Sequence, residues 1–201
     1  MRIMGLLKSI NKKMTLTKCR AVFLDRDGTV NSEVDYLNSI KDLRLIRNTA
    51  KAIRILNLNR VKVIIVTNQS GISRGIFSID DLDNVHNELK RRLRRNGAYI
   101  DAIYYCPHHP DDGCSCRKPK KGMFEKAAND FTLELNKCYV IGDKSSDIES
   151  AHNISAAGIL VRTGYGKLEQ NKLKEANIMP DHIAKNLYDA VQWIIKDINK
   201  G

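Results

Sequence analysis

The sequence predicts an α/β fold in which a parallel β-sheet carries helices on both faces. Short apolar runs rich in valine and isoleucine alternate with longer segments of helical period, which is typical of a doubly wound sheet. Several of these runs end in polar residues, as expected where strands meet a ligand-binding edge. The length of 201 residues suits a single core. We therefore expect one domain over residues 19–201, preceded by an N-terminal arm at residues 1–18.

Strands are expected where β-branched and aromatic residues form short runs between turn signals. These runs are Ala21–Leu24, Val61–Val66, Ile100–Tyr105, Tyr139–Ile141 and Ile159–Val161. Apolar residues at steps of three and four mark two helices. The first carries Ile79, Leu82, Val85, Leu89 and Leu93 and is closed by Gly97. The last helix of the chain carries Leu187, Val191, Ile194, Ile195 and Ile198 behind an N-cap at Asn186. Trp193, Cys19 and Cys138 are expected to pack in the core.

Composition and charge narrow the class of protein. Hydrophobic residues make up 42% and charged residues 28% of the chain, as in ordinary globular proteins. The net charge of +11 favours acidic partners, which include phosphorylated metabolites, nucleic acid and anionic surfaces. No apolar run approaches the roughly 20 residues of a membrane span, and no signal-peptide core is present, so we expect a cytoplasmic protein. Five cysteines, three of them clustered, argue against a secreted disulfide framework and point to a metal.

Two aspartates, Asp25 and Asp27, directly follow the first predicted strand and are followed by Gly28. A buried unpaired carboxylate is costly, so both should lie just past the end of the strand. Residues i and i+2 point the same way, so the two carboxylates can share one reaction centre. One can attack a substrate and bind a divalent cation while the other handles a proton. A solvated turn is the alternative for an isolated Asp-x-Asp.

Two further polar elements follow predicted strands. The segment from Thr67 to Gly75 offers a hydroxyl and successive backbone N–H groups, which suit phosphate oxygens, although it is also an ordinary turn composition. The segment from Val140 ends in Gly142 and Asp143, and a carboxylate there suits Mg²⁺. Asp147, four residues on, is expected to cap the next helix and orient the site.

A loop rich in cysteine and histidine lies between the second and third of these elements. Residues 106–116 supply Cys106, His108, His109, Cys114 and Cys116 in a stretch with too little apolar content to fold by itself. Four such ligands suit a closed tetrahedral zinc site, in which the metal takes the place of a small core. Either histidine could serve as the fourth ligand. The basic cluster Arg117–Lys121 follows at once, and cations held in place there would offset phosphoryl charge.

The segment Phe23–Asn31 resembles the first motif of the haloacid dehalogenase superfamily of phosphotransferases. The arginine between the aspartates and the asparagine after Gly-Thr-Val are similar to the branch that holds heptose bisphosphate phosphatases and histidinol-phosphate phosphatases. The other elements follow in the order of that superfamily, over residues 20–165. The resemblance implies a three-layer Rossmann-like fold with an inserted zinc loop. The spacing between the elements leaves little room for a separate cap domain, so we expect an open site.

The resemblance also implies roles for individual residues. Asp25 would be the nucleophile and Asp27 the general acid and base, while Thr67 and Lys118 would contact the phosphoryl group. Mg²⁺ would be held by the side chains of Asp25 and Asp143 and the main-chain carbonyl of Asp27. Structural Zn²⁺ would be held by Cys106, His108, Cys114 and Cys116, with His108 preferred over His109. The implied substrate-binding residues are Glu33, Val34, Asp35, Tyr36, Asn68, Gln69, Ser70 and Arg117.

The resemblance implies a small phosphorylated metabolite as substrate and a monomeric enzyme. The favoured substrate is D-glycero-D-manno-heptose 1,7-bisphosphate, cleaved at the 7-phosphate, a step towards the heptose of lipopolysaccharide. Histidinol phosphate is the close alternative. A phosphatase for 3′-phosphate ends of nucleic acid is a more distant one, because such relatives lack the zinc loop. A zinc-stapled binding module without activity is disfavoured by the intact acidic and lysine residues.

Overall fold

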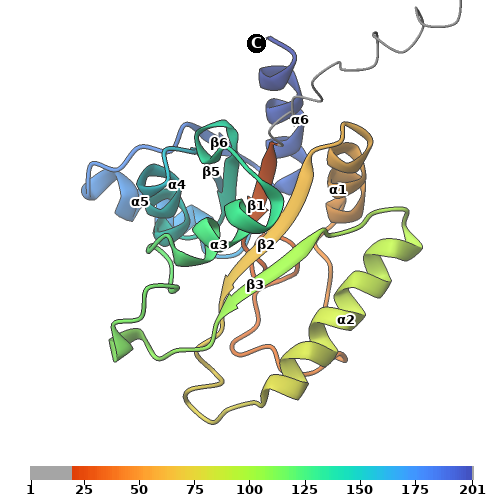
Figure 1. The fold of residues 1–201 in the computed structure, drawn as a ribbon, viewed down its shortest axis with the longest axis vertical. Helices are drawn as coiled ribbons and strands as arrows, with labels where there is room; N and C mark the ends of the chain where they lie inside the picture. The colour runs from red at the N-terminus through yellow and green to blue at the C-terminus, as the bar shows by residue number, and fades with distance from the viewer. Residues whose placement is uncertain (1–19, 201) are drawn as a thin grey trace, which may run out of the picture.

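A computed structural model of the chain describes residues 20–200, so the predicted arm at residues 1–18 and Cys19 lie outside the described residues. Six parallel strands form one sheet in the order β3-β2-β1-β4-β5-β6 (Figure 1). Their bounds are β1 (Ala21–Leu24), β2 (Lys62–Asn68), β3 (Ala102–Cys106), β4 (Tyr139–Gly142), β5 (Ala157–Val161) and β6 (His182–Ala184). The five predicted strands are confirmed, with small shifts at their ends. The three-residue β6 is too short to give a sequence pattern and was not predicted.

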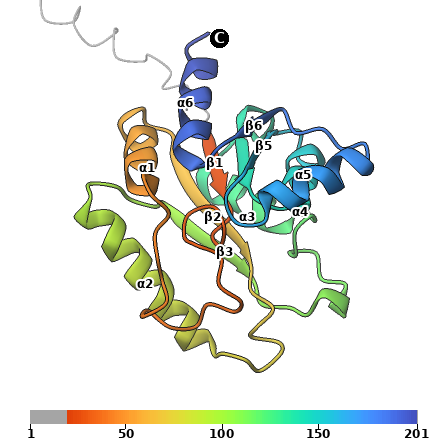
Figure 2. The same ribbon diagram turned by 180° about the vertical axis from the view of Figure 1, so that it is seen from behind.

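Helices cover both faces of the sheet (Figure 1 and, from behind, Figure 2). They are α1 (Thr49–Leu58), α2 (Ile79–Arg95), α3 (Gly122–Phe131), α4 (Ser145–Asn153), α5 (Gly166–Glu175) and α6 (Leu187–Ile198). Alternation along β1 separates the layers: Val22 and Leu24 face the core formed with α1, α2 and α6, whereas Ala21 and Phe23 face α3 and α4. Each face of the sheet therefore has its own hydrophobic core, as the predicted three-layer fold requires.

The two predicted helices form as the pattern indicates. Ser78 starts α2 with a capping box, and the backbone turns left-handed at Gly97 after the helix. Ile79 was expected on the buried stripe of α2 but is 48% exposed, because it is the first residue of the helix and precedes the packed turns. The side chain of Asn186 caps α6, and Trp193 in that helix stacks on the ring of His182 at 4.8 Å.

The strand order places the predicted functional elements together. Strand β1 lies between β2 and β4, and all three strands run parallel. Their carboxyl ends therefore meet at one edge, which brings Asp25, Thr67 and Asp143 side by side. Every strand among residues 20–200 belongs to this sheet, so this part of the chain forms no separate cap domain. No helix in the same range has the length and apolar character needed to cross a membrane.

Candidate active site

Asp25 lies at the end of β1 and is 6% exposed. The ammonium group of Lys118 donates to Asp25 Oδ1 at 2.7 Å and to Asp147 Oδ1 at 2.6 Å, so one buried cation joins two carboxylates. Burial raises the pKa of Asp25 to about 6, and the charge of Lys118 acts in the opposite direction. Although burial disfavours the charged lysine, the two aspartates raise the pKa of Lys118 to about 12. Lys118 is therefore a permanent cation beside the proposed nucleophile.

Asp143 follows β4 and is fully buried. Its Oδ2 accepts the backbone N–H of Tyr165 at 2.8 Å, but its Oδ1 is buried with no hydrogen-bond partner. Glycines make room for this carboxylate, since a Cβ built on Gly28 or Gly164 would lie 2.1 Å from Asp143 Oδ2. Burial, with the charge of Asp25 added, raises the pKa of Asp143 to about 8. A buried carboxylate oxygen without a partner is costly, so the site calls for a cation.

The acidic side chains at this edge fit Mg²⁺. Ligand oxygens of Asp25, Asp143 and Asp147 all lie within 4.8 Å of one another. Asp147 is already engaged, because one oxygen accepts from Lys118 and the other accepts the backbone N–H of Lys144 at 3.1 Å. The predicted capping of α4 by Asp147 is thereby confirmed. The free oxygens of Asp25 and Asp143 are the hard donors that Mg²⁺ prefers.

Asp27 is held differently from Asp25. Arg26 donates from Nε to Asp27 Oδ1 at 3.0 Å and from Nη2 to Oδ2 at 2.7 Å. The side-chain amides of Asn31 and Gln69 donate to the same carboxylate at 2.9 and 3.1 Å. Although burial acts in the opposite direction, the Arg26 charge and these hydrogen bonds lower the pKa of Asp27 below its usual range. Asp27 therefore sits as an oriented carboxylate in the wall of the site.

The second element, after β2, contributes two kinds of contact. Gln69 donates to Thr67 Oγ1 at 2.8 Å, so its amide links the threonine to Asp27. Asn68 makes a reciprocal pair with the backbone of Lys118, accepting its N–H at 3.0 Å and donating to its carbonyl at 3.2 Å. This pair of hydrogen bonds joins the end of β2 to the basic segment that contains Lys118. Lys118 follows Asp25 by 93 residues in the chain. It explains how Lys118 reaches the first motif.

A cavity of about 340 Å³ is lined by Asp27, Asn68, Gln69 and Lys118 from these elements. All eight residues expected to bind substrate line it, namely Glu33, Val34, Asp35, Tyr36, Asn68, Gln69, Ser70 and Arg117. Lys144, Ser146 and Tyr165 also line it and were not predicted. The ammonium group of Lys144 lies 3.2 Å from Glu33 Oε2 and 5.0 Å from the centre of the Tyr165 ring. Lys144 could have been found from the sequence, because it directly follows Asp143. Tyr165 follows β5 in a segment without a recognisable motif, so the sequence did not indicate it.

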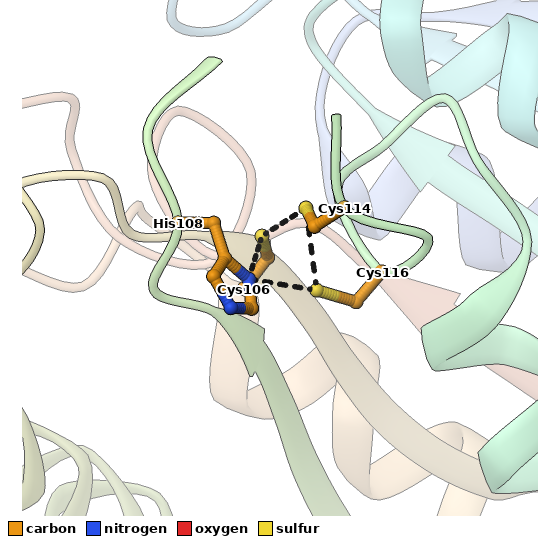
Figure 3. A group of neighbouring side chains, drawn as sticks. All are labelled: Cys106, His108, Cys114 and Cys116. Atoms are coloured by element: carbon orange, nitrogen blue, oxygen red, sulfur yellow. Dashed lines mark hydrogen bonds between the residues drawn. The ribbon is translucent and has the colours of Figure 1, made fainter. Parts of the chain in front are cut away.

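The cysteines and the histidine of the loop converge on one point (Figure 3). Cys106 Sγ lies 3.6 Å from Cys114 Sγ and from His108 Nδ1, and Cys116 Sγ lies 3.6 Å from Cys114 Sγ and 3.2 Å from His108 Nδ1. Zn–S bonds of about 2.3 Å in a tetrahedron put sulfur atoms about 3.8 Å apart, close to these separations. The cluster thus fits zinc, with four protein ligands and no open position.

The two histidines of the loop are placed differently. His108 points into the cluster, whereas the ring of His109 caps the short 3₁₀ turn Pro110–Asp112 and accepts the N–H of Asp111 at 3.4 Å. Lys120 donates to the carbonyls of Gly113 and Cys114 at 2.7 and 2.8 Å, which ties the basic segment to the loop. These hydrogen bonds therefore hold the segment with Arg117 and Lys118 against the loop.

Comparisons with known proteins agree with this geometry. A HAD-hydrolase-like family model matches residues 115–190. The D-glycero-D-manno-heptose-1,7-bisphosphate 7-phosphatase of Thermosynechococcus vestitus is 40% identical over 186 residues, covering 87% of this chain and 94% of the relative. The D-glycero-beta-D-manno-heptose-1,7-bisphosphate 7-phosphatase of Haemophilus ducreyi is 36% identical, covering 87% and 98%. The chain belongs to this phosphatase family of the haloacid dehalogenase superfamily.

A solved structure supports both the fold and the use of magnesium in this phosphatase family. The D,D-heptose 1,7-bisphosphate phosphatase of B. bronchiseptica, complexed with magnesium and phosphate, superimposes with a TM-score of 0.82 at 32% identity, covering 89% of this chain and 99% of the neighbour. In this chain, the free oxygens of Asp25 and Asp143 are suited to the same metal. The expected class, a magnesium-dependent phosphatase with a zinc loop, agrees with these findings.

Proposed function

We propose that the protein removes the 7-phosphate of D-glycero-D-manno-heptose 1,7-bisphosphate through an aspartyl-phosphate formed on Asp25. The observation that carries the reaction is the buried Asp25 with Lys118 Nζ at 2.7 Å, beside a polar cavity that Lys118 and Asp27 line. The substrate is supported by the names of the relatives, because this chain matches them over nearly their whole length.

In the first step, Asp25 attacks phosphorus and the bond from phosphorus to the sugar oxygen breaks. Asp27, a carboxylate in the free site, takes up a proton as the substrate binds and gives this proton to the leaving oxygen. An alcohol then departs and Asp25 carries the phosphoryl group. Lys118 and the hydroxyl of Thr67 offset charge on the phosphoryl oxygens. Mg²⁺ bound by Asp25 and Asp143, with the Asp27 carbonyl, would offset the like charges of nucleophile and phosphate.

In the second step, a water molecule attacks the phosphorus of the aspartyl-phosphate and gives a proton to Asp27. The bond to Asp25 breaks and inorganic phosphate leaves, and Asp27 then releases its proton to solvent, so both aspartates return to their starting state. Asp27 is suited to this step because its oxygens already accept hydrogen bonds that fix the carboxylate in the wall of the cavity. The products are the heptose 1-phosphate and phosphate.

A bisphosphate substrate suits the charges of the cavity. Arg117 and Lys144 line it along with Lys118, and an Arg117 Nη1 is buried without a partner. Lys118 lies at the reacting phosphate beside Asp25, and Lys144 is paired with Glu33, which leaves Arg117 as the cation for the second phosphate of the substrate. Zinc held by the cysteine-rich loop would be structural and would fix Arg117 in the cavity wall.

The test compares kcat/KM for phosphate release from heptose 1,7-bisphosphate and from histidinol phosphate, side by side with Mg²⁺. We expect an excess of at least about 100-fold for the bisphosphate, since about 2.7 kcal/mol separates the two when one site cation is left unpaired. The sugar product should keep its 1-phosphate, which phosphorus NMR can establish. A preference for histidinol phosphate would overturn the substrate but leave the roles of Asp25 and Lys118 untouched.

A further inference from the structure

Arg26 stands between the two aspartates and is completely buried. A guanidinium group withdrawn from water is costly unless its N–H groups find acceptors. Its Nε and Nη2 form a two-pronged contact with Asp27 at 3.0 and 2.7 Å, and Nη2 also reaches Gln69 Oε1 at 3.2 Å. The remaining nitrogen, Nη1, lies 3.1 Å from Nε2 of His86. The position of Arg26 is therefore determined on one side by Asp27 and on the other by a histidine.

His86 comes from the middle of α2, far from any motif of the active site, and is 4% exposed. Arg26 can only donate, so His86 Nε2 must accept and the ring proton must lie on Nδ1. Burial lowers the pKa of His86 to about 3, with the charges of Arg26 and Lys90 adding to the effect, so the ring stays neutral. An apolar residue would fill the same space in α2, but it would leave Nη1 without an acceptor.

We propose that His86 is a positioning residue for the phosphatase reaction, because it anchors Arg26 and Arg26 holds the Asp27 carboxylate against the cavity. The inference rests on the proposed function only in giving Asp27 the role of proton acceptor. Asn31 and Gln69 hold Asp27 from other directions. His86 is the anchor that α2 supplies, so it links a helix outside the motifs to the reacting carboxylate.

The two half-reactions separate this role from a general effect on the fold. With 4-nitrophenyl phosphate, the leaving nitrophenolate needs no proton, so transfer of the phosphoryl group to Asp25 does not depend on Asp27. Hydrolysis of the aspartyl-phosphate still does, because water must give up a proton. A displaced Asp27 should therefore slow the second half-reaction alone. Acetyl phosphate, whose acetate also leaves without a proton, serves as the donor if the cavity excludes the aromatic ring.

The experiment uses His86→Leu, His86→Gln and, as a matched control, His152→Leu at an exposed histidine of α4. Rapid mixing measures the first release of nitrophenolate and the steady-state rate. For His86→Leu we expect a burst near one nitrophenolate per enzyme at a rate within about threefold of the parent, followed by a steady state at least about 10-fold slower. His86→Gln, whose side-chain oxygen can accept from Arg26, should restore the steady state, and His152→Leu should match the parent.

Two results would overturn the proposal. One is a folded His86→Leu variant with unchanged steady-state turnover, and the other is equal loss in the burst and steady-state phases. A preference for another sugar would affect the proposed substrate and not this result, because an aryl phosphate is the probe. If His86→Leu does not fold, the tautomer of His86 is measured in the unmutated protein. Its ¹⁵N spectrum should show His86 protonated at Nδ1 and not at Nε2. A proton on Nε2 is incompatible with acceptance from Arg26.

Discussion

Lys118 Nζ lies 2.7 Å from Oδ1 of Asp25, with 4% and 7% of the two side chains exposed. The same ammonium group lies 2.6 Å from Oδ1 of Asp147. The other oxygen of Asp147 accepts the backbone N–H of Lys144, the N-cap residue of α4. The proposed nucleophile Asp25, the basic segment that follows the zinc loop and helix α4 are therefore joined by one buried cation. This arrangement makes the charge of Lys118 important for both the reaction and the stability of the fold.

Replacing Lys118 by methionine should abolish both contributions. Two buried carboxylates would lose their cation, and breaking a buried pair in this way costs about 3–5 kcal/mol. We expect that loss in the free energy of unfolding, measured by urea denaturation, and a fall in kcat/KM of at least about 10³-fold. Lys126→Met is the control, because Lys126 forms an exposed pair with Asp130 at 3.4 Å. A Lys118→Met variant as stable as the control would contradict the buried ion pair.

Asp25→Asn should abolish turnover while the protein stays folded. The amide has nearly the shape of the carboxylate but cannot attack phosphorus. It also removes a charge from a crowded acidic cluster, where burial already raises the pKa of Asp25 to about 6. We expect the thermal midpoint to change little and phosphate release to fall to the level without enzyme. A properly folded variant that retains activity would exclude Asp25 as the nucleophile.

Removing zinc should displace the basic segment Arg117–Lys121 while the β-sheet stays folded. Cys116→Ser takes one ligand from the cluster, so zinc content should fall from about one atom per chain to nearly none. Arg117 follows Cys116 directly, so we expect KM for the bisphosphate to rise more than kcat falls. Cys138→Ser is the control for zinc content, because Cys138 is buried in the core and does not belong to the group of four converging side chains. Full zinc content in Cys116→Ser would contradict the assigned ligand set.

The sequence was informative wherever a motif coincides with the end of a strand. Asp25, Thr67 and Asp143 could be placed together because parallel neighbouring strands bring their carboxyl ends to one edge. The clustering of Cys106, Cys114 and Cys116 could be predicted because the three lie within one loop, whereas the preference for His108 over His109 depended on the family resemblance. Strand β6 could not, since three residues carry no periodicity.

Contacts between distant segments were beyond the reach of the sequence. His86 lies in the middle of α2, and the apolar residues of α2 are sufficient to predict that helix. Nothing in the sequence around His86 therefore indicates a contact with the active site. Its partner Arg26 is 60 residues away, and only the packing of α2 against the sheet joins them. Tyr165 is a similar case, because its backbone N–H binds Asp143 from a turn after β5. Such pairs depend on tertiary structure, which local patterns do not encode.

Gly28→Ala should impair the magnesium site specifically. The backbone at Gly28 is left-handed with φ of +80°, and a Cβ there would lie 2.1 Å from Oδ2 of Asp143. The methyl group must displace the carboxylate that is suited to hold the metal, so we expect the Mg²⁺ concentration for half-maximal activity to rise at least about 10-fold. Gly75→Ala is the matched control, because its φ is +68° and nothing lies within 4 Å of the added Cβ.

The comparison of these two variants separates backbone strain from damage to the site. Both alanines adopt a left-handed conformation, which costs about 1–2 kcal/mol for a residue with a side chain. The free energy of unfolding should therefore fall by a similar amount in each variant, apart from the added clash at Gly28. Only Gly28→Ala should change the Mg²⁺ requirement, measured by titrating activity with the metal. If Gly75→Ala changes that requirement equally, strain in the backbone and not displacement of Asp143 is the cause.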